Sequence, residues 1–154
     1  MMEKQDPMEI PLQAVGALRA ALGERLVSVV LFGSRARGDA KPESDWDLLV
    51  IAEGLPARYM ERHSFLRRRL PPATAGVSLL AKTPSEFESY LPPLYLDIAL
   101  DGKILYDPRG FAATKLNYLR GLIEGAGLFR EQTTAGYIWR WRKQPVAEWE
   151  LAWA

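Results

Sequence analysis

Two apolar runs enclose a polar loop in the stretch LFGSRARGDAKPESDWDLLV, from Leu31 to Val50, and this stretch limits the folds open to the chain. The flanking runs VSVVLFG and WDLLVIA are typical of buried strands. Asp45 and Asp47 begin the second run. Residues two apart on a strand project from one face, roughly 6 to 7 Å apart, so both carboxylates are predicted at one rim while Trp46 points into a core.

These side chains suit a site for a metal ion and a phosphate. Two carboxylates this close raise each other's proton affinity, and a hard cation such as Mg²⁺ would relieve the repulsion and still leave positions for substrate oxygens. Gly33 allows close backbone approach to an anion, and Ser34 offers a hydroxyl and N–H donors. The alternative is a strand, loop and strand whose polar loop contains acids by chance.

The loop between the two runs carries three cations, Arg35, Arg37 and Lys41. They could steer a triphosphate toward the acids, although a solvated loop is the simpler interpretation for any one of them. Arg35 follows Ser34 directly and is the candidate for a phosphate contact.

The motif resembles the signature of the DNA polymerase beta-like nucleotidyltransferase superfamily, especially its minimal nucleotidyltransferases (MNT), which include the MntA antitoxins paired with HEPN toxins. Gly33, Ser34, Asp45 and Asp47 match the family motif, and Ser44 completes its S-D-x-D-L form. A later stretch, LYLDIALDGKILYDP, resembles the family's helix and final strand, so the similarity covers about residues 10–110. The resemblance implies an α+β fold with a small mixed sheet and helices packed mainly on one face.

One position departs from that family. Many relatives resemble V-D-h-V on the third strand, where the Asp is a third carboxylate that ligands metal and accepts a proton. This chain has Ser78 there, and a hydroxyl cannot replace that charge. Asp97 and Asp101 are the acids that could substitute, but they match the helix after that strand and are expected away from the site.

The resemblance implies a Mg²⁺-dependent enzyme that transfers a nucleoside monophosphate, AMP from ATP in the favoured interpretation, to an acceptor hydroxyl. Asp45 and Asp47 would be the catalytic metal ligands, and Gly33, Ser34 and Arg35 would bind the nucleotide. A tyrosine of a HEPN-domain toxin is the implied acceptor. Two alternatives stay open: a catalytically weak module that neutralises its partner by contact, and a terminal transferase acting on nucleic acid.

Composition narrows these choices. With 154 residues, 48% hydrophobic and 25% charged, the chain is expected to form a globular domain. A net charge of +1 gives no sign of nucleic-acid or membrane binding. Cysteine is absent, and no apolar run is long enough to span a bilayer, so we expect a cytoplasmic protein. Self-association is left open.

The remaining elements follow from periodicity and from start and stop signals. We expect a nucleotidyltransferase domain over 1–130 and a Trp-rich extension over 131–154. His63, the single histidine, is either a general base or a hydrogen-bonded residue beside the core. In a C-terminal strand, Trp139 and Trp141 would share one face, suited to packing or protein contact, with a nucleic-acid platform as the alternative. Helices are expected over 7–22, 56–70, 84–90 and 94–100 and from 107 to about 125, and strands over 27–32, 45–52, 76–82 and 103–106.

Overall fold

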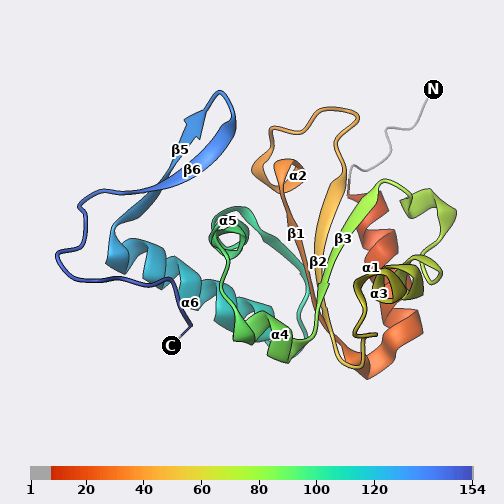
Figure 1. The fold of residues 1–154 in the computed structure, drawn as a ribbon. Helices are drawn as coiled ribbons and strands as arrows, with labels where there is room; N and C mark the ends of the chain where they lie inside the picture. The colour runs from red at the N-terminus through yellow and green to blue at the C-terminus, as the bar shows by residue number, and fades with distance from the viewer. Residues whose placement is uncertain (1–7, 154) are drawn as a thin grey trace.

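A mixed four-stranded sheet forms the centre of the protein in a computed structural model that describes residues 8–153 (Figure 1). The strand order is β3-β2-β1-β4. β1 pairs antiparallel with β2 and with β4, whereas β2 and β3 run parallel. The predicted α+β class with a mixed sheet is confirmed.

Every strand and helix expected up to residue 126 is present, with ends shifted by a few residues. The short helix α2 and the hairpin strands β5 and β6 complete the fold. The expected helix start at Asp6 and Pro7 lies outside the described residues. The strands are β1 (Leu26–Phe32), β2 (Trp46–Ala52), β3 (Val77–Lys82), β4 (Lys103–Tyr106), β5 (Leu128–Thr133) and β6 (Gly136–Trp141). The helices are α1 (Glu9–Leu22), α2 (Ser34–Arg37), α3 (Tyr59–Arg67), α4 (Pro84–Ser89), α5 (Pro93–Asp101) and α6 (Phe111–Ala126), with 3₁₀ turns at Gly23–Arg25 and Pro72–Thr74.

Helices cover both faces of the sheet, not mainly one as predicted (Figure 1). α1 and α3 pack on the face that carries Leu31 and Leu48, and α4, α5 and α6 pack on the face that carries Val30 and Leu49. The central strands explain this arrangement. β1 and β2 are apolar at nearly every position, and a strand of that kind can bury both of its faces.

A separate hairpin follows α6, which ends at Gly127 in a left-handed conformation. β5 and β6 pair antiparallel, with Leu128 opposite Trp141 and Thr133 opposite Gly136. Trp139 and Trp141 pack together against the α4, α5 and α6 face, as their alternation predicts. The hairpin straddles residue 130, where the sequence places the domain boundary.

The final residues return to the same core. The Trp153 indole nitrogen donates to the carbonyls of Phe87 and Tyr90, at 3.1 Å each. Its ring lies 5.5 Å from that of Phe87 and 5.6 Å from that of Tyr118. This part of the Trp-rich tail therefore packs on α4 and α6.

β3 forms one edge of the sheet, and two arginines cover it. The Trp46 amide donates to the Gly76 carbonyl, so alternation turns the carbonyls of Val77 and Ala81 outward. Arg67 donates to the Val77 carbonyl, and Arg62 donates to the Ala81 carbonyl at 3.1 Å. Guanidinium groups therefore occupy the outward acceptors near both ends of this edge.

No helix among residues 8–153 is long and apolar enough to cross a membrane.

Candidate active site

The turn after β1 places a glycine directly against an acid on β2. Gly33 has a φ of 74°, a conformation that favours glycine, and it opens α2. Its carbonyl accepts the amides of Ala36 and Arg37 at 3.1 and 3.0 Å. A methyl group added at Gly33 would overlap the Asp47 carboxylate. The predicted closeness of the glycine turn to Asp47 is therefore present.

Strand pairing explains this closeness. Phe32, the last residue of β1, is opposite Asp47 in the antiparallel pair with β2. Asp47 is half-buried, and Asp45 is exposed just before the strand begins. Burial raises the pKa of Asp47, the Asp45 charge raises it further, and the Arg37 charge acts in the opposite direction. The two carboxylates thus repel each other at one rim of the sheet.

Arg35 stabilises the loop in this structure. Its Cζ lies 4.5 Å from the Trp46 ring centroid, and its Nη2 donates to the carbonyls of Pro42 and Ser44 at 3.2 and 3.0 Å. Trp46 packs on the α1 and α3 side of the sheet, whereas Asp47 projects to the other side. The expected contact between Arg35 and a phosphate stays a prediction. In this structure, Arg35 donates to loop carbonyls.

Arg37 lies on the Asp47 side, where it belongs to a small polar network. Its Nε donates to Asp39 Oδ2 at 3.2 Å, and the same oxygen accepts the Tyr137 hydroxyl at 3.3 Å. Hydrogen bonding from Arg37 lowers the pKa of Asp39. Local sequence patterns do not predict this network, because Tyr137 lies 98 residues after Asp39 and carries no local signal of the contact.

Ser78 lies beside Asp47 in the parallel register of β2 and β3. Paired residues of neighbouring strands share a face, so this serine occupies the place where the resemblance implies a third acid. Asp97 and Asp101 do not replace it. Both bind Arg130, and no cluster of three metal-ligating acids or histidines exists among residues 8–153.

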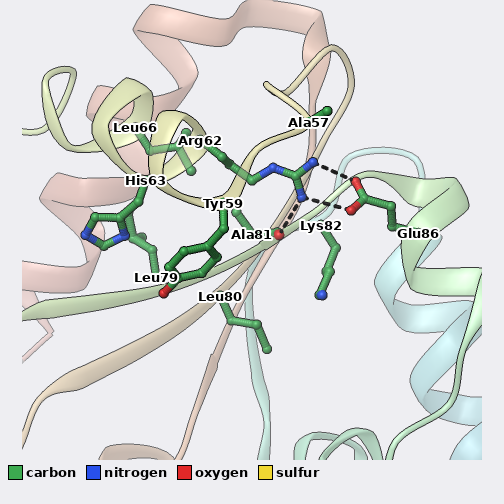
Figure 2. Close-up of a pocket in the computed structure, with 10 residues that line it drawn as sticks. All are labelled: Ala57, Tyr59, Arg62, His63, Leu66, Leu79, Leu80, Ala81, Lys82 and Glu86. Carbon is green, nitrogen blue, oxygen red and sulfur yellow. Dashed lines mark hydrogen bonds and ion pairs between the residues drawn. The ribbon is translucent and has the colours of Figure 1, made fainter.

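A cavity of about 230 Å³ lies apart from this rim, between α3 and the β3 edge (Figure 2). Within it, Arg62 pairs with Glu86 through two hydrogen bonds of 3.0 and 2.9 Å. His63 is exposed here and stacks on Tyr59 with 6.3 Å between ring centroids. The expectation of a histidine beside the core is wrong, because α3 buries Arg62 and Leu66 instead.

Comparison with known proteins identifies the class. Residues 15–106, more than half of the chain, match the family model described as a nucleotidyltransferase domain. A Methanocaldococcus jannaschii protein, named as a candidate protein adenylyltransferase, is 36% identical over 107 residues, which cover 66% of this chain and 73% of the relative. The chain therefore belongs to the nucleotidyltransferase family and is a nucleotidyltransferase.

Solved structures agree on the fold. A candidate nucleotidyltransferase from Sulfolobus solfataricus has a TM-score of 0.50 at 20% identity, over 70% of this chain and 94% of that one. A toxin–antitoxin structure with AMP-PNP also has a TM-score of 0.50, at 19% identity, over 74% of this chain and 90% of that one. At these identities the likeness extends to the fold alone.

Proposed function

We propose that the protein transfers AMP from ATP to a hydroxyl of another protein in a Mg²⁺-dependent reaction. The observation that carries the proposal is the pair Asp45 and Asp47, in which Asp47 lies against the Gly33 turn and no protein cation among residues 8–153 forms an ion pair with either acid. Burial and then the charge of Asp45 raise the pKa of Asp47, and a bound divalent cation would offset the repulsion between the two carboxylates.

Asp45 and Asp47 would hold the magnesium ion at the rim. When bound, the ion would polarise the α-phosphate and stabilise the charge of the departing pyrophosphate. The missing third acid at Ser78 favours a site that relies on these two carboxylates alone.

Gly33, Ser34 and Arg37 are the proposed contacts for the remaining phosphates. The absent side chain of Gly33 allows an anion to approach the backbone closely, and the Ser34 hydroxyl can donate to it. Arg37 is preferred over Arg35 because its charge already acts on Asp47, whereas Arg35 is bound to loop carbonyls. Their role is alignment and electrostatic stabilisation.

The proposed acceptor is a tyrosine of a HEPN-domain toxin. The sequence resembles the antitoxins of HEPN/MNT pairs, and the name of the Methanocaldococcus jannaschii relative supports both a protein acceptor and an adenylyl group. The similar toxin–antitoxin structure contains AMP-PNP, an analogue of ATP, which supports the choice of nucleotide.

The test is transfer of labelled AMP to a HEPN-domain protein encoded beside this chain. Wild-type protein with Mg-ATP should label that partner, and Asp47→Asn should abolish the labelling. Lys103→Gln is a matched control, because it changes an exposed charge on the far edge strand β4. An unlabelled partner in the wild-type reaction would count against the proposal.

The absence of a third acid supports a second candidate function, neutralisation of the toxin by stoichiometric contact. Under that function, Asp45→Asn would still bind the partner and still protect cells that express the toxin. Growth rescue by the variant, measured beside AMP transfer, separates the two functions.

A further inference from the structure

Tyr137, outside the matched family region, brings a hydroxyl group to the loop that joins the candidate active-site residues of α2 and β2. It lies on β6, next to the turn of the hairpin, and contacts Asp39 in the loop that follows α2. Its hydroxyl donates to Asp39 Oδ2 at 3.3 Å. Two guanidinium groups lie over its ring, with Arg37 Cζ 5.1 Å and Arg130 Cζ 4.5 Å from the ring centroid.

The hairpin is held in this position by α5. Arg130 on β5 binds Asp101 at 2.9 Å and Asp97 at 3.1 Å, and the Trp139 indole donates to Asp97 at 3.2 Å. Arg130 and Asp101 are nearly buried, with side chains 10% and 11% exposed. These contacts hold β5 at Arg130 and β6 at Trp139, on the same strand as Tyr137, so packing on α5 fixes the position of the phenol beside the Asp39 loop.

Asp39 is placed to accept a proton from that phenol. Within the described part of the chain, no third acid joins Asp45 and Asp47 in a metal-binding cluster, so an attacking hydroxyl needs another proton acceptor. Asp39 already accepts the hydrogen bond of the Tyr137 hydroxyl, and Arg37 links this carboxylate to the Asp47 side of the rim. Nucleophile, proton acceptor and phosphate-binding cation thus belong to one connected group.

We propose that Tyr137 is an acceptor for AMP from the same chain, a step that rests on the nucleotidyl transfer proposed above. The Tyr137 Oη forms a bond to the α-phosphorus of ATP, and the bond from that phosphorus to the oxygen bridging to the β-phosphate breaks. Pyrophosphate leaves with that electron pair, and the phenolic proton passes to Asp39 and then to water. The product is an AMP–tyrosine phosphodiester beside Arg37 and Arg130, whose charges stabilise it.

Position, not exposure, selects this tyrosine. Tyr59 and Tyr90 are more open, at 78% and 68% exposed against 37% for Tyr137. However, Tyr59 lies beside the cavity at the β3 edge (Figure 2), and Tyr90 follows α4. The Tyr118 hydroxyl donates to the Ala152 carbonyl, and burial raises the pKa of Tyr95 to about 12. A random reaction with ATP would modify the exposed pair first.

The first experiment maps self-modification. Full-length protein is incubated with Mg²⁺ and ATP labelled at the α-phosphate, and the labelled peptide is identified by mass spectrometry. We expect one AMP on Tyr137, loss of labelling in Tyr137→Phe, and unchanged labelling in the control Tyr59→Phe. Thermal unfolding of Tyr137→Phe should match wild type, which shows that the loss does not come from misfolding. Label on any other tyrosine overturns the inference.

A second experiment tests the role of Asp39. Asp39→Asn should slow self-labelling at least about tenfold, because an amide cannot accept the proton. Raising the pH toward the pKa of a free phenol should recover part of that rate in the variant. A rate unchanged by Asp39→Asn would overturn the assignment of the proton acceptor.

A third experiment separates reaction within a chain from reaction between chains. Asp47→Asn protein keeps Tyr137 but should lack transfer activity, so it serves as a passive acceptor when mixed with wild type. We expect label on wild type alone, with a fractional rate that does not change on dilution.

The same wild-type reaction is also run with a HEPN-domain partner. This arm distinguishes failure of the Tyr137 inference from failure of the proposed function. Label on the partner with none on Tyr137 would overturn this inference and leave the proposed function in place. Absence of label on both proteins would overturn both.

Discussion

The molecule contains two acid pairs of opposite character. Asp45 and Asp47 share one side at the start of β2, and Asp97 and Asp101 share one side of α5. Arg130 binds the second pair directly, whereas no described lysine, arginine or histidine forms an ion pair with the first. Among the described residues, the α5 pair, Asp97 and Asp101, thus has a protein counter-charge, whereas the β2 pair, Asp45 and Asp47, has none in direct contact.

This difference shows how aspartate can serve either the stability of the fold or the binding of a ligand. Binding by Asp101 and Asp97 raises the pKa of Arg130, and the charges of that cluster cancel within the protein. Burial and the neighbouring Asp45 raise the pKa of Asp47, so its negative charge is costly until a cation arrives from outside. The α5 pair therefore stabilises the fold, and the β2 pair is suited to a ligand.

The largest effect should come from Asp47→Asn. We expect AMP transfer to fall at least about a thousandfold, or roughly 4 kcal/mol in activation free energy. Without metal, the thermal unfolding midpoint should stay level or rise, because the variant removes an acid whose pKa is raised in the folded state. Asp101→Asn is the control, and an equal loss of transfer there would break the contrast between the two pairs.

The variant Arg130→Met tests the α5 pair, Asp97 and Asp101. Removing this cation leaves Asp97 and Asp101 without their partner, and loss of one member of a buried ion pair costs about 3 kcal/mol or more. Urea unfolding should show that loss as a lower midpoint. The triple variant Arg130→Met, Asp97→Asn and Asp101→Asn should recover part of it, and failure to recover would show that the charge balance is not the cause.

Ser78→Asp should sharpen the contrast by adding an acid to the pair that has no counter-charge. Ser78 is in register with Asp47, so the new carboxylate should lower stability in metal-free buffer by about 0.5 kcal/mol. Mg²⁺ should then raise the unfolding midpoint more than it does in wild type. An equal rise in both proteins would count against a metal site at this rim.

The last prediction concerns Glu86, an acid that pairs with the protein cation Arg62. Hydrogen bonds from Arg62 lower its pKa from 4.5 to about 2. Its contribution is therefore present above pH 4.5 and is lost as the pH falls toward 2. Since the Glu86 side chain is 42% exposed, solvent limits the contribution to about 1 kcal/mol or less. Thermal midpoints between pH 6 and 2 should fall more steeply in wild type than in Glu86→Gln.

Local signals predicted most of the fold. The sheet strands and main helices follow from apolar periodicity, and the capping box of Thr83 and Glu86 at the start of α4 is present. The placement of helices on both faces was missed, although the unbroken apolar runs of β1 and β2 carry that information. β5 was missed because LFREQT has no clear alternation after the helix.

The candidate site was predictable where it lies within one stretch. The closeness of Gly33 to Asp47 follows from two strands joined by a single loop. The network of Arg37, Asp39 and Tyr137 was not predictable, because it depends on how a distant hairpin docks on α5. The buried Arg62 was also missed, since burial of its charge depends on distant partners, Glu86 on α4 and the Ala81 carbonyl on β3.

The arginine-covered edge of β3 has a consequence for aggregation at high protein concentration. A bare edge strand offers a template on which a strand of another molecule can extend the sheet, which is the first step of many aggregation reactions. With Arg62 and Arg67 donating to the outward carbonyls of Ala81 and Val77, an incoming strand would have to displace two cations before it could register. The same arginines that complete this side of the domain thus protect it from polymerising through its sheet.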